Sequence, residues 1–308
     1  MKYQIHPDYQ ITDRIPLAVS QNLLRKCKIP EQIEIREISI PSADPDTQLL
    51  SYLYIPTHID APLPLILDIH GGGFTGGDAL MDRNRDINLA LNVPCIVLAI
   101  NYRLAPKHPY PAALMDCYAA WNWLHQNAEK LGGDPEQMGL FGTSAGGNLC
   151  AGLAFYVRDH GGPKISLNAI NVPVLSMGTS LSKDQMRYDA PVLSDSKGHN
   201  SFRVYLPDLN GQYPPYYAVP NAAFDFIGLP PTLIIAAEYD PLREDALLYA
   251  KNLRAADVPV ELYLMPRVGH GFGMVADAPM TKWIWQGIAL SFRREFKISS
   301  SKPLYTTL

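Results

Sequence analysis

Short apolar runs rich in β-branched residues alternate along this chain with longer segments in which apolar residues recur at helical spacing. This alternation predicts an α/β fold, in which a mostly parallel sheet is covered by helices on both faces. We expect eight strands, the first two of which pair as an antiparallel edge. The expected strands span residues 33–40, 48–55, 65–69, 94–101, 137–141, 168–174, 231–237 and 259–265.

Four helices are predicted between or after these strands. The clearest begins at Pro111, continues with apolar residues at helical spacing and ends at Gly132-Gly133. A second helix begins at Ser144. A third runs from Pro241 to about Ala255, and a fourth runs from Pro279 to Arg294.

Two segments do not fit the alternation of strands and helices. They are the N-terminal residues, about 1–30, and an insertion at 176–225 that is rich in polar, proline and aromatic residues. Insertions of this length in an α/β domain are usually functional or disordered. We therefore expect one domain over residues 1–308, with both segments forming a cap over the carboxyl edge of the sheet, where such sheets bind ligands.

Composition narrows the possible partners. Apolar residues make up 47% of the 308 residues and charged residues 18%, which is typical of a globular protein. A formal net charge of −4 and the lack of a Lys/Arg run give no binding surface for nucleic acid. A small molecule is the expected partner.

The chain gives no signal for export, membrane insertion or a metal. Its four cysteines, Cys27, Cys95, Cys117 and Cys150, contain no CxxC pair, so neither a zinc site nor a disulfide framework is predicted. The N-terminus lacks the apolar stretch of a signal peptide, and no apolar run approaches the length of a membrane span. We expect a cytoplasmic protein without cofactors.

The sequence Gly142-Thr143-Ser144-Ala145-Gly146 follows a predicted strand and precedes a predicted helix. A G-x-S-x-G turn in this position can expose its serine as a nucleophile, because glycines on both sides allow the sharp reversal of the chain. The alternative is a turn of small residues that packs a helix tightly on the sheet. We predict that Ser144 is the nucleophile.

A glycine-rich loop, His70-Gly71-Gly72-Gly73-Phe74, follows the strand at 65–69. Backbone N–H groups of such a loop can stabilise a developing oxyanion, and we expect Gly72, Gly73 and Ala145 to donate them. His70 is expected to brace the loop by hydrogen bonding. Because Gly71, Gly73 and Gly76 also match G-x-G-x-x-G, a dinucleotide-binding turn is the alternative. That alternative needs an acidic residue at the end of the next strand, which instead ends in Ile100-Asn101-Tyr102.

The general base and its acid are predicted from their places after the last two strands. His270 follows the final strand between two glycines, although a structural loop histidine is the alternative. Asp240 follows the seventh strand and completes the order serine, acid, histidine. An Asp before a Pro is also an ordinary helix cap. The other acids available in this loop are Glu238, Glu244 and Asp245.

Several motifs in register resemble the bacterial hormone-sensitive-lipase family of esterases, over roughly residues 60–275. They are HGGGF at 70–74, NYRLAP at 101–106, PYPA at 109–112, GTSAGGN at 142–148, DPLR at 240–243 and HGF at 270–272. Many relatives have Asp where this chain has Thr143, so any role of that Asp does not transfer.

The resemblance implies a serine carboxylesterase of the α/β-hydrolase fold, acting on esters with short or medium acyl chains and often dimeric. A deacetylase, amidase or peptidase on the same triad is an alternative, because the core motifs are shared. A non-catalytic receptor built on a hydrolase fold is another. Such receptors usually lack the catalytic histidine, whereas His270 is present here.

Overall fold

The computed structural model describes residues 4–13, 29–57, 59, 62–177, 201–206, 209 and 212–299. Within them lies one eight-stranded sheet in the order β1-β2-β4-β3-β5-β6-β7-β8. The strand β2 is antiparallel to β1 and β4, and all other neighbours are parallel. The strands are β1 (Ile33–Pro41), β2 (Gln48–Pro56), β3 (Leu63–Ile69), β4 (Ile96–Ile100), β5 (Gly133–Thr143), β6 (Leu167–Asn171), β7 (Thr232–Ala237) and β8 (Val260–Met265). The predicted α/β fold and its antiparallel edge are confirmed.

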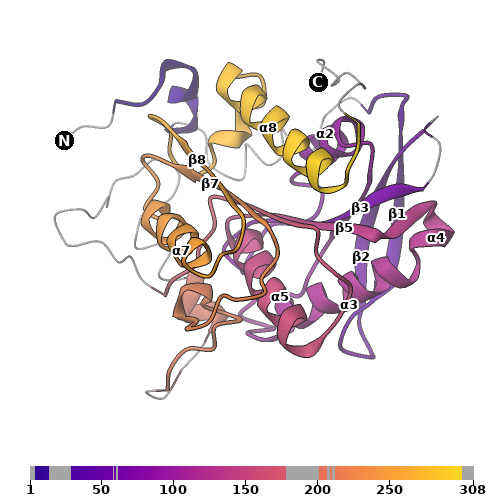
Figure 1. The fold of residues 1–308 in the computed structure, drawn as a ribbon, viewed down its shortest axis with the longest axis horizontal. Helices are drawn as coiled ribbons and strands as arrows, with labels where there is room; N and C mark the ends of the chain where they lie inside the picture. The colour runs from indigo at the N-terminus through magenta and orange to yellow at the C-terminus, as the bar shows by residue number, and fades with distance from the viewer. Residues whose placement is uncertain are drawn as a thin grey trace.

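Helices cover both faces of this sheet (Figure 1). One face is covered by α2 and α8, and the other by α3, α5 and α7. The α-helices are α2 (Arg83–Asn92), α3 (Ala112–Gln126), α4 (Ala128–Leu131), α5 (Ala145–His160), α7 (Arg243–Ala255) and α8 (Pro279–Glu295). Short 3-10 turns are η1 (Pro7–Asp13), η2 (Pro220–Ala222) and η3 (Phe272–Met274). None of the helices described here has the length and apolar character needed to span a bilayer.

Alternation along the central strands divides the core into two layers. In β3, Leu65 and Leu67 pack with α3 and α5, whereas Ile66 packs on the side of α2 and α8. Side chains in a strand alternate between faces, so Asp68 belongs to the side of Ile66. A charged residue thus occupies the layer beneath α2, where it is fully buried.

Several predicted boundaries differ from the structure. The strand β6 ends at Asn171 rather than at 174, because Val172 has a φ of +41° and Pro173 has no N–H to continue the ladder. The helix α7 begins at Arg243 rather than at Pro241. The predicted helix from Pro111 is divided into α3 and α4, and the sequence did not predict α2 at all.

Most of the predicted cap lies outside the described residues. Of the insertion, residues 201–205 are helical, and the rings of Phe202 and Tyr205 lie 5.5 Å and 3.9 Å from that of Phe74, next to the glycine loop. Of the N-terminal segment, the His6 N–H donates to the carbonyl oxygen of Arg267 at 2.9 Å. The described parts therefore contact loops at the carboxyl edge of the sheet, and the cap as a whole stays a prediction.

Candidate active site

Ser144 stands at a sharp turn between β5 and α5, with φ 57° and ψ −116°. A non-glycine residue with positive φ is strained and persists only where its surroundings enforce it. Close packing enforces it here: a Cβ on Gly142 would lie 2.4 Å from the carbonyl oxygen of Gly146, and one on Gly146 would lie 1.9 Å from that of Ile69. Both glycines are therefore required for the turn that exposes Ser144.

The three predicted side chains meet in series. The Oγ of Ser144 lies 3.0 Å from Nε2 of His270, and Nδ1 of His270 lies 2.7 Å from Oδ2 of Asp240. Because a carboxylate only accepts, Nδ1 carries the hydrogen and Nε2 is left to accept from the serine hydroxyl. The His270 side chain is 11% exposed and that of Asp240 only 1%. The arrangement can move a proton from the serine to an oriented imidazole.

Asp240 also holds its own loop. Its second oxygen accepts the N–H of Leu242 at 2.9 Å, which places the carboxylate at the turn before α7. One oxygen of Asp240 thus contacts His270 and the other holds the turn, whereas the N-cap position of α7 is occupied by Leu242 and not by Asp240. The competing acids have other partners: Glu238 accepts the Arg267 N–H, Glu244 pairs with Arg243, and Asp245 accepts from Leu175 and Ser176.

The glycine loop lies beside the serine. Gly72 and Gly73 have φ of +123° and +63°. Side chains would clash there, since a Cβ on Gly72 would lie 2.0 Å from the Gly76 carbonyl oxygen and one on Gly73 would lie 2.7 Å from Oγ of Ser201. In the parts of the chain that the structure describes, no hydrogen bond uses the N–H of Gly72 or Gly73. These are the two N–H groups that the sequence predicts as oxyanion donors.

His70 braces this loop, as predicted. Its Nδ1 donates to the Gly71 carbonyl oxygen at 2.6 Å, and its ring stacks on Tyr102 with centroids 4.2 Å apart. The Tyr102 hydroxyl in turn donates to the His70 carbonyl oxygen at 2.9 Å. Burial lowers the pKa of His70, so the ring is neutral and acts as a fixed support.

The dinucleotide alternative is not supported. Its fingerprint requires the glycine turn to open directly into a helix. The next helix, α2, begins only at Arg83, and Asn101 at the end of the neighbouring strand segment accepts the Ala79 N–H instead of facing a ribose site. In the described ranges, no group of three or more His, Cys, Asp or Glu side chains could hold a metal ion.

Residues 66–274 match the model of a family described as having the alpha/beta hydrolase fold. The chain belongs to that family. The match covers more than half of the sequence and contains Ser144, Asp240 and His270, so the resemblance seen in the motifs is confirmed.

Similar proteins of this alpha/beta hydrolase family include esterases. The chain is 36% identical over 265 residues to the carboxylesterase NlhH of Mycobacterium tuberculosis, covering 83% of this chain and 82% of that protein. It is 35% identical over 258 residues to the esterase LipI of the same species, covering 83% and 80%. A solved structure titled bacterial heroin esterase has a TM-score of 0.85 and 31% identity, covering 91% of this chain and 89% of that one.

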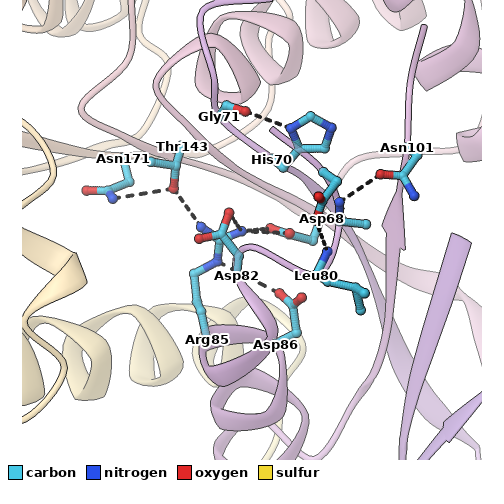
Figure 2. Close-up of polar contacts among 12 residues, drawn as sticks. Asp68, His70, Gly71, Leu80, Asp82, Arg85, Asp86, Asn101, Thr143 and Asn171 are labelled. Atoms are coloured by element: carbon cyan, nitrogen blue, oxygen red, sulfur yellow. Dashed lines mark hydrogen bonds and ion pairs between the residues drawn. The ribbon is translucent and has the colours of Figure 1, made fainter. Parts of the chain in front are cut away.

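Sequence reasoning missed one charged residue at this site. Arg85, in the first turn of α2, donates to Oγ1 of Thr143, the residue before Ser144, at 2.7 Å (Figure 2). The segment Asp82–Asp86 is mostly charged or polar and resembles an exposed helix start. Asp68 is the one charged residue in an otherwise apolar strand, and it alone could have indicated a buried cation nearby.

Proposed function

We propose that this protein is a serine carboxylesterase that hydrolyses esters with short or medium acyl chains through an acyl-enzyme. The observation that supports it is the pair of contacts in series, 3.0 Å from Ser144 to His270 and 2.7 Å from His270 to Asp240. Identity of 35–36% to a carboxylesterase and an esterase over most of the chain supports the same substrate class. The expected partner is a small-molecule ester rather than a nucleic acid.

In the first step, the Ser144 oxygen attacks the ester carbonyl carbon while Nε2 of His270 takes the hydroxyl proton. The carbonyl oxygen becomes an oxyanion, to which the N–H groups of Gly72, Gly73 and Ala145 donate. Ala145 is the first residue of α5, so the positive end of that helix dipole also favours the oxyanion. Protonated His270 then passes its proton to the alcohol oxygen, which leaves.

In the second step, His270 takes a proton from water, and the resulting hydroxide attacks the acyl carbon. The second oxyanion collapses, the proton returns to the Ser144 oxygen, and the carboxylic acid is released. Asp240 keeps Nδ1 protonated and stabilises the imidazolium that forms in both steps.

Replacement of the nucleophile tests the proposal. Ser144→Ala should lower kcat on p-nitrophenyl acetate by about 10³-fold or more while leaving the fold intact, because only the attacking oxygen is lost. Ser39→Ala, an exposed serine on β1, is the matched control and should retain wild-type kcat. Turnover by Ser144→Ala close to that of the control would refute the assignment.

Substrate selectivity is measured with a panel of compounds that share the triad mechanism. We expect p-nitrophenyl esters from acetate to octanoate to be hydrolysed with a maximum at short or medium length, and faster than acetylated sugars or anilides. A preference for sugar acetates or anilides would indicate the deacetylase or amidase alternatives. Binding without turnover of any compound would indicate the receptor.

We also propose that residues 1–30 and 176–225 form the cap of the site.

We propose in addition that the protein is a homodimer. The strand β8 ends the sheet and exposes Leu262 and Leu264, while α8 exposes Trp283 and Leu290. Such an edge is a suitable surface for a second copy. Light scattering should give a dimer mass, and Leu264→Lys should give a monomer.

A cytoplasmic location is proposed as well, supported by three free cysteines, Cys95, Cys117 and Cys150, all buried in reduced form. Cell fractionation with an antibody to the chain checks it. Recovery of the protein outside the cytoplasm would refute this part.

A further inference from the structure

A buried charged cluster lies on the side of the sheet that faces α2 and includes a contact with Thr143, the residue before Ser144 (Figure 2). Arg85 is its centre, with a side chain that is only 5% exposed. Its Nη2 donates to both oxygens of Asp68 at 2.6 Å, its Nη1 donates to Thr143, and Asp82 lies 3.1 Å away. Its guanidinium also lies 4.6 Å from the centre of the Phe141 ring. The side chain is thus held from several directions.

Two of the partners of Arg85, Asp68 and Thr143, belong to the two strands that lead into the candidate site. Asp68 lies two residues before His70 on β3, and Thr143 immediately precedes Ser144 on β5. These strands are parallel neighbours, with Asp68 opposite Phe141. Since side chains alternate between faces, Asp68, Phe141 and Thr143 all face α2. One guanidinium therefore joins the strand that carries the oxyanion loop to the strand that carries the nucleophile.

Backbone hydrogen bonds alone leave this junction incomplete. The ladder between β3 and β5 ends at Ile69 and Gly142, one and two residues before the loop and the serine. Beyond this ladder, the Ser144 N–H donates to the Asn171 carbonyl oxygen at 2.9 Å, so the turn is hydrogen-bonded to β6, on the side of β5 away from β3. The contacts of Arg85 connect the turn to the other neighbour, β3, which leads into the glycine loop.

The chemistry of arginine suits this task. Its planar fork can bond a carboxylate and a hydroxyl at once, and it keeps its charge when buried. Burial raises the pKa of Asp68 to about 6, although Arg85 opposes this by favouring the carboxylate. A lysine would keep the positive charge but lacks the planar guanidinium that bonds both groups at once.

We propose that Arg85 is a positioning residue, which fixes the nucleophile turn against the oxyanion loop by bridging Thr143 and Asp68. This inference rests on the proposed ester hydrolysis. Attack requires the serine oxygen and the oxyanion donors to be placed to within a fraction of an ångström, and a misplacement of about 1 Å can lower the rate about 10²-fold. Loosening the bridge therefore slows the chemical step more than it weakens substrate binding.

Two substitutions at Thr143 test the bridge with little change of volume. Thr143→Val keeps the branched shape but removes Oγ1, whereas Thr143→Ser keeps the hydroxyl. With p-nitrophenyl acetate, Thr143→Val should lower kcat about tenfold and leave KM within about twofold, the pattern of an interaction that matters in the transition state. Thr143→Ser should restore most of the lost kcat. Inactivation by the organophosphate paraoxon should slow in Thr143→Val by a similar factor.

Variants of the arginine show whether the two residues act through each other. Arg85→Lys should also lower kcat, while Arg36→Lys, in an exposed ion pair, should not. The double variant Arg85→Lys/Thr143→Val should lose no more kcat than Arg85→Lys alone, because both changes break one bridge. Losses that multiply would overturn the shared role.

The outcomes separate this inference from the proposed function. A wild-type protein that neither hydrolyses the ester nor reacts with paraoxon would refute the function itself. A wild-type protein that does both, with Thr143→Val equal to it in kcat and in inactivation rate, would overturn the positioning role alone, whatever happens to thermal stability.

Discussion

The two faces of the sheet differ most where β3 and β5 end beneath the site. On the face covered by α3 and α5, Leu67 and Leu140 are fully buried among apolar side chains. On the face covered by α2, Asp68 and Thr143 are held by Arg85. Packing supports the first face and a buried ionic network supports the second. Both faces contribute to stability, and the directional contacts of the polar face are the ones that we propose position the serine.

The largest effect is expected from removing the cation of the network. Arg85→Leu leaves Asp68 buried without its counter-charge, so the free energy of unfolding should fall by about 3–5 kcal/mol. Urea denaturation measures it. The matched control is Arg36→Leu: the Arg36–Glu34 pair is also 2.6 Å apart, but its side chains are 49% and 46% exposed. There the loss should be about 0–1 kcal/mol. Equal losses would contradict the contrast.

A substitution on the apolar face should affect stability alone. Leu67→Ala, next to Asp68 but facing the other way, should lower the free energy of unfolding by about 2–5 kcal/mol through lost burial and a cavity. The kcat of the folded fraction on p-nitrophenyl acetate should stay within about twofold of wild type. A kcat loss matching that of Arg85→Lys would show that both faces position the serine.

A smaller effect on stability is expected from Asp245 on α7, a buried carboxyl on the face of the sheet that α3 and α5 also cover. This carboxyl accepts the N–H groups of Leu175 and Ser176. Burial raises its pKa to about 7. The unfolded chain releases this proton near pH 4, so between about pH 4 and 7 the native state holds a proton that the unfolded state has lost. Stability from this group is therefore present at low pH and lost as pH rises toward 7.

Asp245→Asn removes that titration while keeping an oxygen acceptor. Relative to wild type, the variant should gain about 2–3 kcal/mol of unfolding free energy as the pH rises from 5 to 8. Urea denaturation at both pH values measures the difference. A stability difference that does not change between the two would mean that Asp245 is ionised throughout.

The triad could be predicted from sequence because each member follows a strand in a short motif. Ser144 lies between two glycines, Asp240 precedes a proline, and His270 lies between two more glycines. Parallel strands bring their carboxyl ends to one edge, so the order of the motifs was enough to bring the residues together. The contacts among Ser144, His270 and Asp240 in the structure agree with that prediction.

The network around Arg85 could not be predicted in the same way. Its helix, α2, begins with polar residues that resemble a solvated surface, and burial of Arg85 depends on Asp68, which lies 17 residues earlier on a neighbouring strand. Periodicity reports which residues share a face, but not which polar side chain another one compensates. The end of β6 was misplaced for a related reason, since Asn171 and Val174, on either side of Val172, hydrogen-bond to the backbone of Ser144, a contact between distant parts of the sequence.

The central claim is that Ser144 is activated as a nucleophile by His270 and Asp240. Mass spectrometry after treatment with paraoxon tests it most directly, because only an activated serine is phosphorylated at a stoichiometric ratio. The account predicts one diethylphosphoryl group per chain, located on Ser144 after digestion, and no mass change in Ser144→Ala. A wild-type chain that stays unmodified, or a label found on another residue, would contradict it.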